Sequence, residues 1–152
     1  MTWKKTRKTN RSLLTLFPYL DHMAKTPNQK WEEEITSYRK KCQRILLVSS
    51  SIRYVGLINE YGRTLTGIIK QGTQPLLKPG QVRNEFFLIS TMLSMRNNNY
   101  SSIGDMDYAI FKHKKVTLLV FSKKEGVYYI SVDQNVTFGS LSEIIKKIKK
   151  LI

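Results

Sequence analysis

One stretch decides the fold of this chain: Tyr54-Val55-Gly56-Leu57-Ile58-Asn59-Glu60-Tyr61-Gly62-Arg63-Thr64-Leu65-Thr66-Gly67-Ile68-Ile69. It contains two apolar runs separated by Asn59-Glu60-Tyr61-Gly62, and asparagine and glycine are residues that tight turns prefer. Gly62 can adopt the left-handed backbone conformation that a bulged hairpin requires. The stretch therefore predicts two antiparallel strands joined by a four-residue turn, beginning at Ile52 and ending at about Lys70.

Two glycines lie inside these predicted strands, Gly56 and Gly67. Glycine weakens a strand, so an interior glycine often marks a place where another backbone, a helix or a ligand comes close. We interpret both as the site of a helix packed tightly across the sheet, in preference to a ligand.

An amphipathic helix precedes the hairpin. Thr26-Pro27-Asn28-Gln29 has the pattern of a capping box with proline at the first helical position. One apolar stripe follows at helical spacing, formed by Trp31, Ile35, Tyr38, Cys42, Ile45 and Leu46. Because Cys42 lies within this stripe, we predict a buried and unreactive thiol.

The remaining elements follow from turn residues and apolar periodicity. The segment 71–80 is rich in glycine and proline and predicts a loop, with Leu76 and Leu77 folded inward to anchor it. A second helix is predicted from about 81 to 96, and a final helix begins at Ser140, with Glu143 completing a capping box. Three short strands are predicted between these helices, at 108–112, 116–122 and 127–133.

These elements predict an α+β domain over residues 26–152 with the order α-β-β-α-β-β-β-α. One five-stranded antiparallel sheet, flanked by helices, would bury all three helical stripes. Residues 1–25 form a separate N-terminal arm that is first basic and then apolar. The arm either lies pinned to the surface of the domain or touches a membrane or nucleic acid.

The second predicted helix carries more apolar surface than one sheet face needs. Val82, Phe86, Ile89 and Leu93 fall on a single stripe. Further apolar side chains widen this face, which indicates a second partner, and self-association is the simplest. We predict a homodimer whose contact surface is the adjacent sheet edge and four residues of this helix: Phe86, Phe87, Met92 and Met95.

The charge of the chain suggests an alternative. It has 26 Lys and Arg against 11 Asp and Glu, a formal net charge of +15, which attracts nucleic acids and other polyanions. Tyr128 and Tyr129 lie among surface lysines, but strand alternation points them to opposite faces, so at least one packs in the core. The arm is the main candidate for polyanion binding, through Lys4, Lys5, Arg7, Lys8 and Arg11.

Residues able to carry out catalysis are scarce. The single cysteine excludes an internal disulfide and a multi-cysteine zinc site, and it fits a cytoplasmic protein. His22 and His113 belong to no metal or nucleophile motif, and no Walker-type glycine loop occurs. No apolar run approaches the ~20 residues of a membrane-spanning helix. We therefore predict a protein that is not an enzyme and has no cofactor or metal.

The order of elements resembles the roadblock (dynein light chain) group within the profilin-like folds. This resemblance implies a small, usually dimeric domain that acts as a scaffold or a regulator of small GTPases. Residues from about 42 to 152 also resemble a family of small archaeal proteins known from ammonia-oxidising archaea. The residues that carry this second resemblance are Ile52–Ile58, Gly62, Gly67, Gly72, Pro75, Leu76, Leu77, Ile103, Gly104, Tyr108, Lys115, Val116, Ile144, Ile145, Lys146 and Lys147.

The sequence thus favours a non-enzymatic interaction or scaffold module, and nucleic-acid or polyanion binding is the alternative. A third hypothesis is a small-molecule sensor, because profilin-like sheets can hold a ligand. No polar constellation in the sequence supports this third hypothesis.

Overall fold

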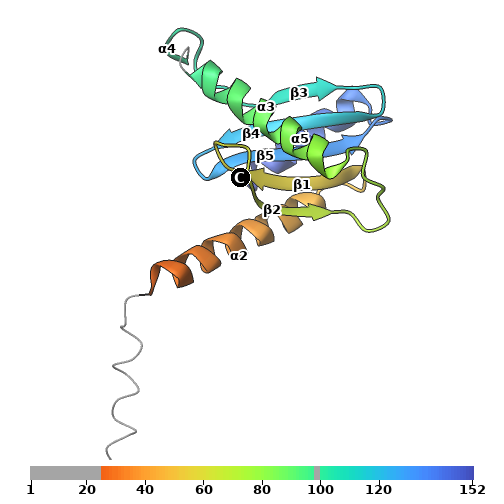
Figure 1. Ribbon diagram of the computed structural model, residues 1–152. Coiled ribbons are helices and arrows are strands. Elements are labelled where there is room, and N and C mark those ends of the chain that lie inside the picture. Colours follow the sequence, from red (N-terminus) through yellow and green to blue (C-terminus); the bar gives the residue numbers. More distant parts are fainter. Residues whose placement is uncertain (1–24, 98–99) are drawn as a thin grey trace, which may run out of the picture. The chain divides into compact units, whose positions relative to one another are not determined.

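The computed structural model describes residues 25–97 and 100–152 (Figure 1). The chain divides into two compact units, of which the first ends at Glu32 and the second is Glu33–Ile152. The second unit contains the whole sheet. The elements are α2 (Pro27–Leu46), β1 (Ile52–Ile58), β2 (Thr64–Ile69), α3 (Pro79–Asn97), α4 (Tyr100–Ile103), β3 (Ala109–Lys112), β4 (Val116–Lys123), β5 (Gly126–Asp133) and α5 (Phe138–Lys149).

The predicted fold class is confirmed, with the short helix α4 as an addition that the sequence did not indicate. One five-stranded sheet has the order β2-β1-β5-β4-β3, and every neighbouring pair is antiparallel. β1 and β5 pair through the middle of the sheet, although β2, α3, α4, β3 and β4 lie between them in the sequence. β2 and β3 form the two edges.

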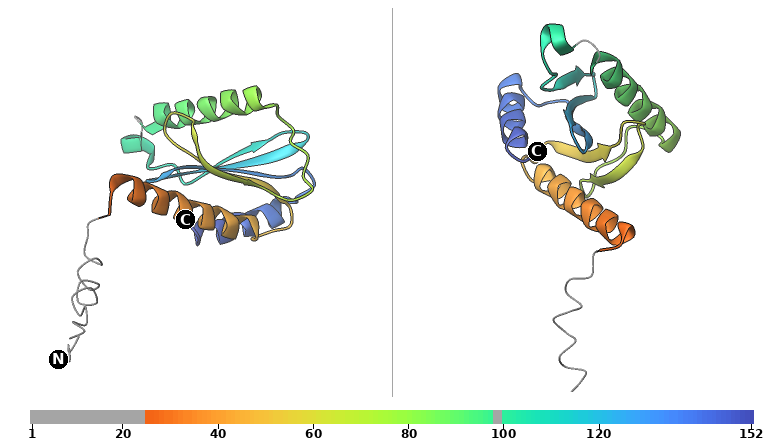
Figure 2. Two further views of the ribbon diagram at one scale, coloured as in Figure 1. Left: turned by 60° about the horizontal axis from the view of Figure 1, so that its bottom comes forward. Right: turned by 90° about the vertical axis from the view of Figure 1, so that its left-hand side faces the viewer.

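Helices cover both faces of the sheet (Figure 2). On one face, α5 and the C-terminal part of α2 pack on a core that includes Cys42, Val55, Tyr128 and Ile148. On the other face, α3 packs on a second core; its members are Ile58, Phe86, Ile89, Leu93, Leu118, Val120, Val127 and Tyr129. The sheet is therefore buried on both sides. This explains why β4 and β5 are apolar almost throughout and do not alternate.

The turn between β1 and β2 forms as predicted. The side-chain oxygen of Asn59 accepts hydrogen bonds from the backbone N–H groups of Tyr61 and Arg63, at 3.0 and 2.9 Å. Gly62 has φ = 77°, the left-handed conformation that glycine adopts without steric cost. The turn is thus held by local hydrogen bonds to Asn59, a residue whose preference for turns is visible in the sequence.

The two strand glycines are explained by a side chain and not by a helix. Gly56 and Gly67 pair across β1 and β2, and the ring of Tyr54 lies over both. A Cβ atom on either glycine would collide with the Tyr54 ring and its hydroxyl. The expectation of a helix packed against these glycines is therefore wrong, because Tyr54, two residues before Gly56, lies on the same face and fills that space.

The helix starts show one confirmed prediction and one correction. The Thr26 backbone N–H donates to Gln29 Oε1 at 2.9 Å and the Gln29 N–H to Thr26 Oγ1 at 3.3 Å, which is the predicted capping box. α5 begins at Phe138 and not at Ser140, because the Thr137 hydroxyl accepts the Ser140 N–H and caps the helix three residues earlier.

The apolar stripe of α2 is buried only near its C-terminal end. Cys42 and Ile45 are fully buried, Ile35 and Tyr38 are partly exposed, and Trp31 keeps 52% of its surface exposed. In the loop before α3, Leu76 and Leu77 are 49% and 39% exposed. The expectation that these two leucines fold inward is wrong, because both border an open cavity and stay exposed.

Candidate functional site

The outer side of α3 exposes large apolar side chains. Phe87 is 58% exposed, Leu88 61% and Met95 67%. Leu88 and Met95 are seven residues apart and so lie on one stripe of the helix, with Phe87 beside them. We call Phe87, Leu88 and Met95 the α3 surface. Three such side chains within three turns of one helix form a patch of the kind that marks an interaction site.

The predicted contact residues divide between this surface and the core. Phe87 and Met95 belong to the α3 surface, whereas Met92 is partly buried against the core. Phe86 is only 3% exposed, and its ring centroid lies 4.9 Å from that of Tyr129. Phe86 is therefore a core residue in this structure, because it is the sheet-facing member of the Phe-Phe pair. Leu88 was missed, although its spacing of seven residues from Met95 was visible in the sequence.

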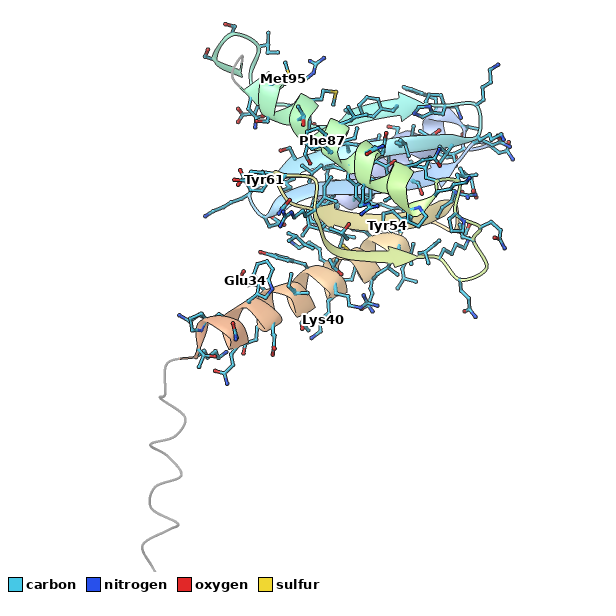
Figure 3. The ribbon with its side chains drawn as sticks, in the orientation of Figure 1. Glu34, Lys40, Tyr54, Tyr61, Phe87 and Met95 are labelled. Carbon is cyan, nitrogen blue, oxygen red and sulfur yellow. The ribbon has the colours of Figure 1, made fainter. Side chains whose placement is uncertain are left out.

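The β1–β2 turn is fixed against α3 and brings Tyr61 to this region. The Ser90 hydroxyl, in α3, donates a hydrogen bond to the carbonyl oxygen of Asn59 at 3.1 Å. Gly62 lies so close to the backbone at Phe87 that a Cβ atom would stand 2.7 Å from the Phe87 Cα. Tyr61 is 69% exposed, and Figure 3 shows it in the turn, with Phe87 and Met95 along α3.

The open edge of β3 adjoins the core that α3 covers. β3 pairs with β4 alone among the described residues, so the backbone groups along its outer edge have no strand partner there. Ala109 and Phe111 of β3 pack against the core that α3 covers. Such an edge can pair with a strand of another chain unless it is protected.

The structure gives no support to the candidate polyanion-binding residues that the sequence indicated. Lys4, Lys5, Arg7, Lys8 and Arg11 lie outside the described residues. Tyr128 and Tyr129 are 0% and 5% exposed, on opposite faces of the sheet, so neither can stack on a nucleobase. The lysines of α5 are exposed, opposite its buried stripe.

Groups suited to catalysis do not gather in the part of the chain that the structure describes. No set of three or more His, Cys, Asp and Glu residues is placed to hold a metal ion among residues 25–97 and 100–152. Cys42 is buried as predicted, and this burial raises the pKa of its thiol to about 11. His113 is exposed in the turn between β3 and β4. None of the described helices is long and apolar enough to cross a bilayer.

The five-stranded antiparallel sheet, with α3 on one face and α2 and α5 on the other, has the fold of roadblock/LC7-like α+β domains. Solved structures agree. The chain is similar to the gliding protein MglB of Thermus thermophilus, with a TM-score of 0.57 and 13% identity, over 85% of this chain and 90% of that one.

Two further structures support the same class. MglB of Myxococcus xanthus has a TM-score of 0.59 and 15% identity, over 78% of this chain and 86% of that one. A roadblock/LC7 domain of Streptomyces avermitilis has a TM-score of 0.50 and 10% identity, over 74% and 94%. No family model and no curated protein matches the chain. At these identities the likeness establishes the fold.

Proposed function

We propose that this protein is a non-enzymatic interaction module that forms a homodimer through the α3 surface and the neighbouring edge of the sheet. The observation that carries the proposal is the exposure of Phe87, Leu88 and Met95, each more than half exposed, on one helix. Removing such a side chain from water in an interface stabilises the complex by roughly 1.5–3 kcal/mol. A two-fold axis would place the same patch of both protomers in contact, so a single apolar surface suffices.

A second copy is the occupant that we favour for this surface. MglB has been described in a tetrameric arrangement, which supports self-association for a chain of this fold. The resemblance of the element order to roadblock domains further suggests that the dimer serves as a scaffold or regulator for another protein, such as a small GTPase. A cytoplasmic location fits the buried free thiol.

The oligomeric state tests the proposal. We expect light scattering coupled to gel filtration to give twice the mass of one chain at micromolar concentration, and the Leu88→Glu variant to give the mass of one chain. Leu47→Glu is the matched control, because Leu47 is 84% exposed outside the α3 surface. A wild-type protein that stays monomeric at high micromolar concentration would contradict the proposal, as would dissociation by the control substitution.

A second candidate function is polyanion binding, which the charge of the chain favours. Without the five basic residues and Asp21 of residues 1–24, there remain 21 basic and 10 acidic residues, a formal charge of +11. Each neutralised phosphate adds about −0.9 to the slope of log K against log salt on duplex DNA. Fluorescence anisotropy with arbitrary DNA and RNA at two salt concentrations measures this slope. Unchanged binding after deletion of residues 1–12 would remove the arm from the candidate site.

A further inference from the structure

A cavity of about 500 Å³ lies on the sheet face that α3 covers. Its floor is formed by Tyr54, Leu118 and Tyr129, and Val82 and Phe86 of α3 form one wall. Ligand-binding cavities typically enclose about 300–1,000 Å³ and are mostly apolar with a few polar groups, as this one is. Phe87, Leu88 and Met95 do not line it, so the cavity is separate from the α3 surface.

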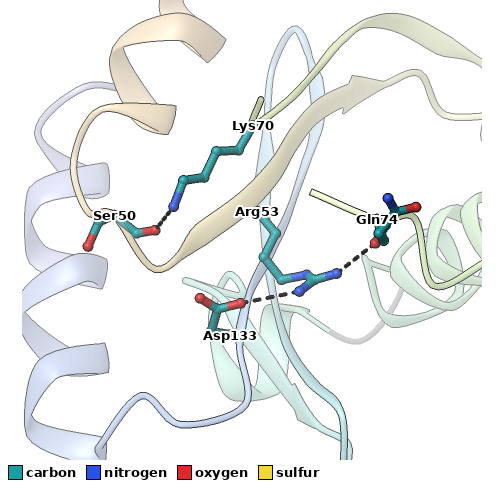
Figure 4. Close-up of polar contacts among 5 residues, drawn as sticks. All are labelled: Ser50, Arg53, Lys70, Gln74 and Asp133. Carbon is teal, nitrogen blue, oxygen red and sulfur yellow. Dashed lines mark hydrogen bonds and ion pairs between the residues drawn. The ribbon is translucent and has the colours of Figure 1, made fainter. Parts of the chain in front are cut away.

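The loop between β2 and α3 forms the opposite wall, and a hydrogen bond from Arg53 ties this loop to β1. The Arg53 guanidinium donates to the carbonyl oxygen of Gln74 at 2.9 Å and lies 3.3 Å from Asp133 Oδ1 (Figure 4). Lys70 donates to the carbonyl oxygen of Ser50. Arg53 thus links Gln74 of the loop to Asp133 of β5, and Leu76 and Leu77 of the same loop border the cavity.

The ionisable groups that line the cavity differ in their partners. Lys115 and His113, in the turn between β3 and β4, are exposed and form no side-chain hydrogen bond or ion pair with another described residue. Arg53 is already neutralised by Asp133. Glu85 lines the wall on α3, and its Oε1 accepts a hydrogen bond from the buried Tyr129 hydroxyl at 3.4 Å. The cavity thus has a free cation at one place and a carboxylate at another.

The strand register separates these two charges. Lys115 directly precedes Val116, which pairs with Asp133 at the end of β5, whereas Tyr129 pairs with Val120. A ligand that spans the cavity would therefore have one end near Lys115 and the other near Glu85.

We propose that this cavity binds a monocarboxylate with an apolar tail. The carboxylate pairs with Lys115 at the mouth, and the tail lies on Tyr54 and Leu118 beneath Phe86. Glu85 repels a second carboxylate at the far end, so a dicarboxylate of equal length binds more weakly. The positive charge of the whole chain favours the approach of an anion.

Nuclear magnetic resonance of the full-length protein, labelled at its Ile, Leu and Val methyl groups, tests the proposal. Decanoate, decan-1-ol and decanedioate are the three probes. We expect decanoate to shift the methyl signals of Val82, Val116 and Leu118 and to leave those of Leu47 unchanged. We expect decanol to bind at the same place about 3–10-fold more weakly, since it lacks the charge-assisted contact. Absence of binding, or shifts confined to residues outside the cavity, would overturn the proposal.

Substitutions at two residues test the roles of the charges in the cavity. Lys115 is exposed and Glu85 is half-buried, so neither change should unfold the protein. Lys115→Gln should weaken decanoate binding about 3–10-fold and leave decanol binding unchanged. Lys124→Gln is the control, because Lys124 is exposed in the other turn of β4 and does not line the cavity. Glu85→Gln should tighten decanedioate about 3–10-fold and leave decanoate unchanged. Equal affinities for decanoate and decanol, or no effect of Lys115→Gln, would refute the assigned ligand class. Binding that persists in Leu88→Glu shows that this site is independent of the proposed dimer.

Discussion

Gly62, in the turn between β1 and β2, lies directly against the backbone of Phe87 in α3. A Cβ atom on Gly62 would stand 2.7 Å from both the Cα and the N of Phe87. Both partners are main-chain atoms, so no side-chain rotation can relieve the contact. The turn that was readable in the sequence thus also fixes the helix that carries the proposed contact surface.

We predict that Gly62→Ala lowers the free energy of unfolding by about 2–5 kcal/mol. The left-handed backbone (φ = 77°) contributes about 1–2 kcal/mol of this cost, and forcing α3 away from the turn adds about 1–3 kcal/mol. Gly72→Ala is the matched control, because Gly72 has φ = 78° and open space around it. Urea unfolding followed by circular dichroism measures both. Equal losses in the two variants would show that the contact with Phe87 costs nothing.

A second prediction concerns the ring of Tyr54 over the paired glycines. Gly67→Ala should destabilise the protein by about 1–3 kcal/mol, because the new methyl group overlaps the Tyr54 hydroxyl. Tyr54→Phe removes that hydroxyl, so the Gly67→Ala substitution should cost less in a Tyr54→Phe background. A double-mutant cycle by urea unfolding measures this coupling. A coupling energy of zero would contradict the assigned contact.

The sequence predicted the backbone of this fold well, because its signals are local. The capping box at Thr26 and the Asn59–Gly62 turn depend on residues within four positions of one another, and both formed as expected. The start of α5 was missed because Thr137 and Ser140 are both capable caps, and the burial of Leu141 on the sheet suits either start.

The side-chain environments were predicted less well, because they depend on contacts between distant segments. Phe86 and Phe87 are adjacent and chemically identical, and only the packing of Phe86 on Tyr129 decides which one is exposed. The cavity was not foreseen, because the Arg53–Gln74 bond that holds its loop links residues with no shared pattern. Its charged residues come from three separate segments, which explains why no polar constellation was visible in the sequence.

A third prediction concerns the reactivity of Cys42. Burial raises the pKa of this thiol from its usual 9.0 to about 11, which alone lowers the thiolate fraction about a hundredfold at mildly alkaline pH. We therefore expect Ellman's reagent to react at least ~100-fold more slowly with the native protein than with the protein unfolded in urea. A native rate close to the unfolded rate would show that the thiol is accessible, against its position in the core.

The last prediction concerns how the free energy of unfolding changes at low pH, and it depends on Glu125. Its Oε1 accepts hydrogen bonds from the Tyr128 hydroxyl at 2.7 Å and from the Lys41 ammonium at 2.9 Å. Burial by itself raises the pKa of Glu125, but these two hydrogen bonds, together with a backbone hydrogen bond and the positive charge of Lys41, outweigh it and lower the pKa below the usual 4.5. A carboxylate with a lowered pKa stabilises the folded state above its unfolded-state pKa, and this stabilisation is lost as the pH falls through the folded-state value.

We therefore expect Glu125→Gln to cost about 1 kcal/mol of unfolding free energy at neutral pH, a size appropriate to a half-buried pair that solvent partly screens. The difference between the variant and the wild type should shrink as the pH falls below about 4.5. Urea unfolding at a series of pH values from neutral to about 3 measures this difference. Glu143→Gln is the control, because the Glu143–Lys146 pair is exposed at the surface and should cost less than ~0.5 kcal/mol at every pH. A Glu125→Gln penalty that does not change with pH would show that the ionised carboxylate is not the stabilising species, and that packing around Tyr128 accounts for the loss.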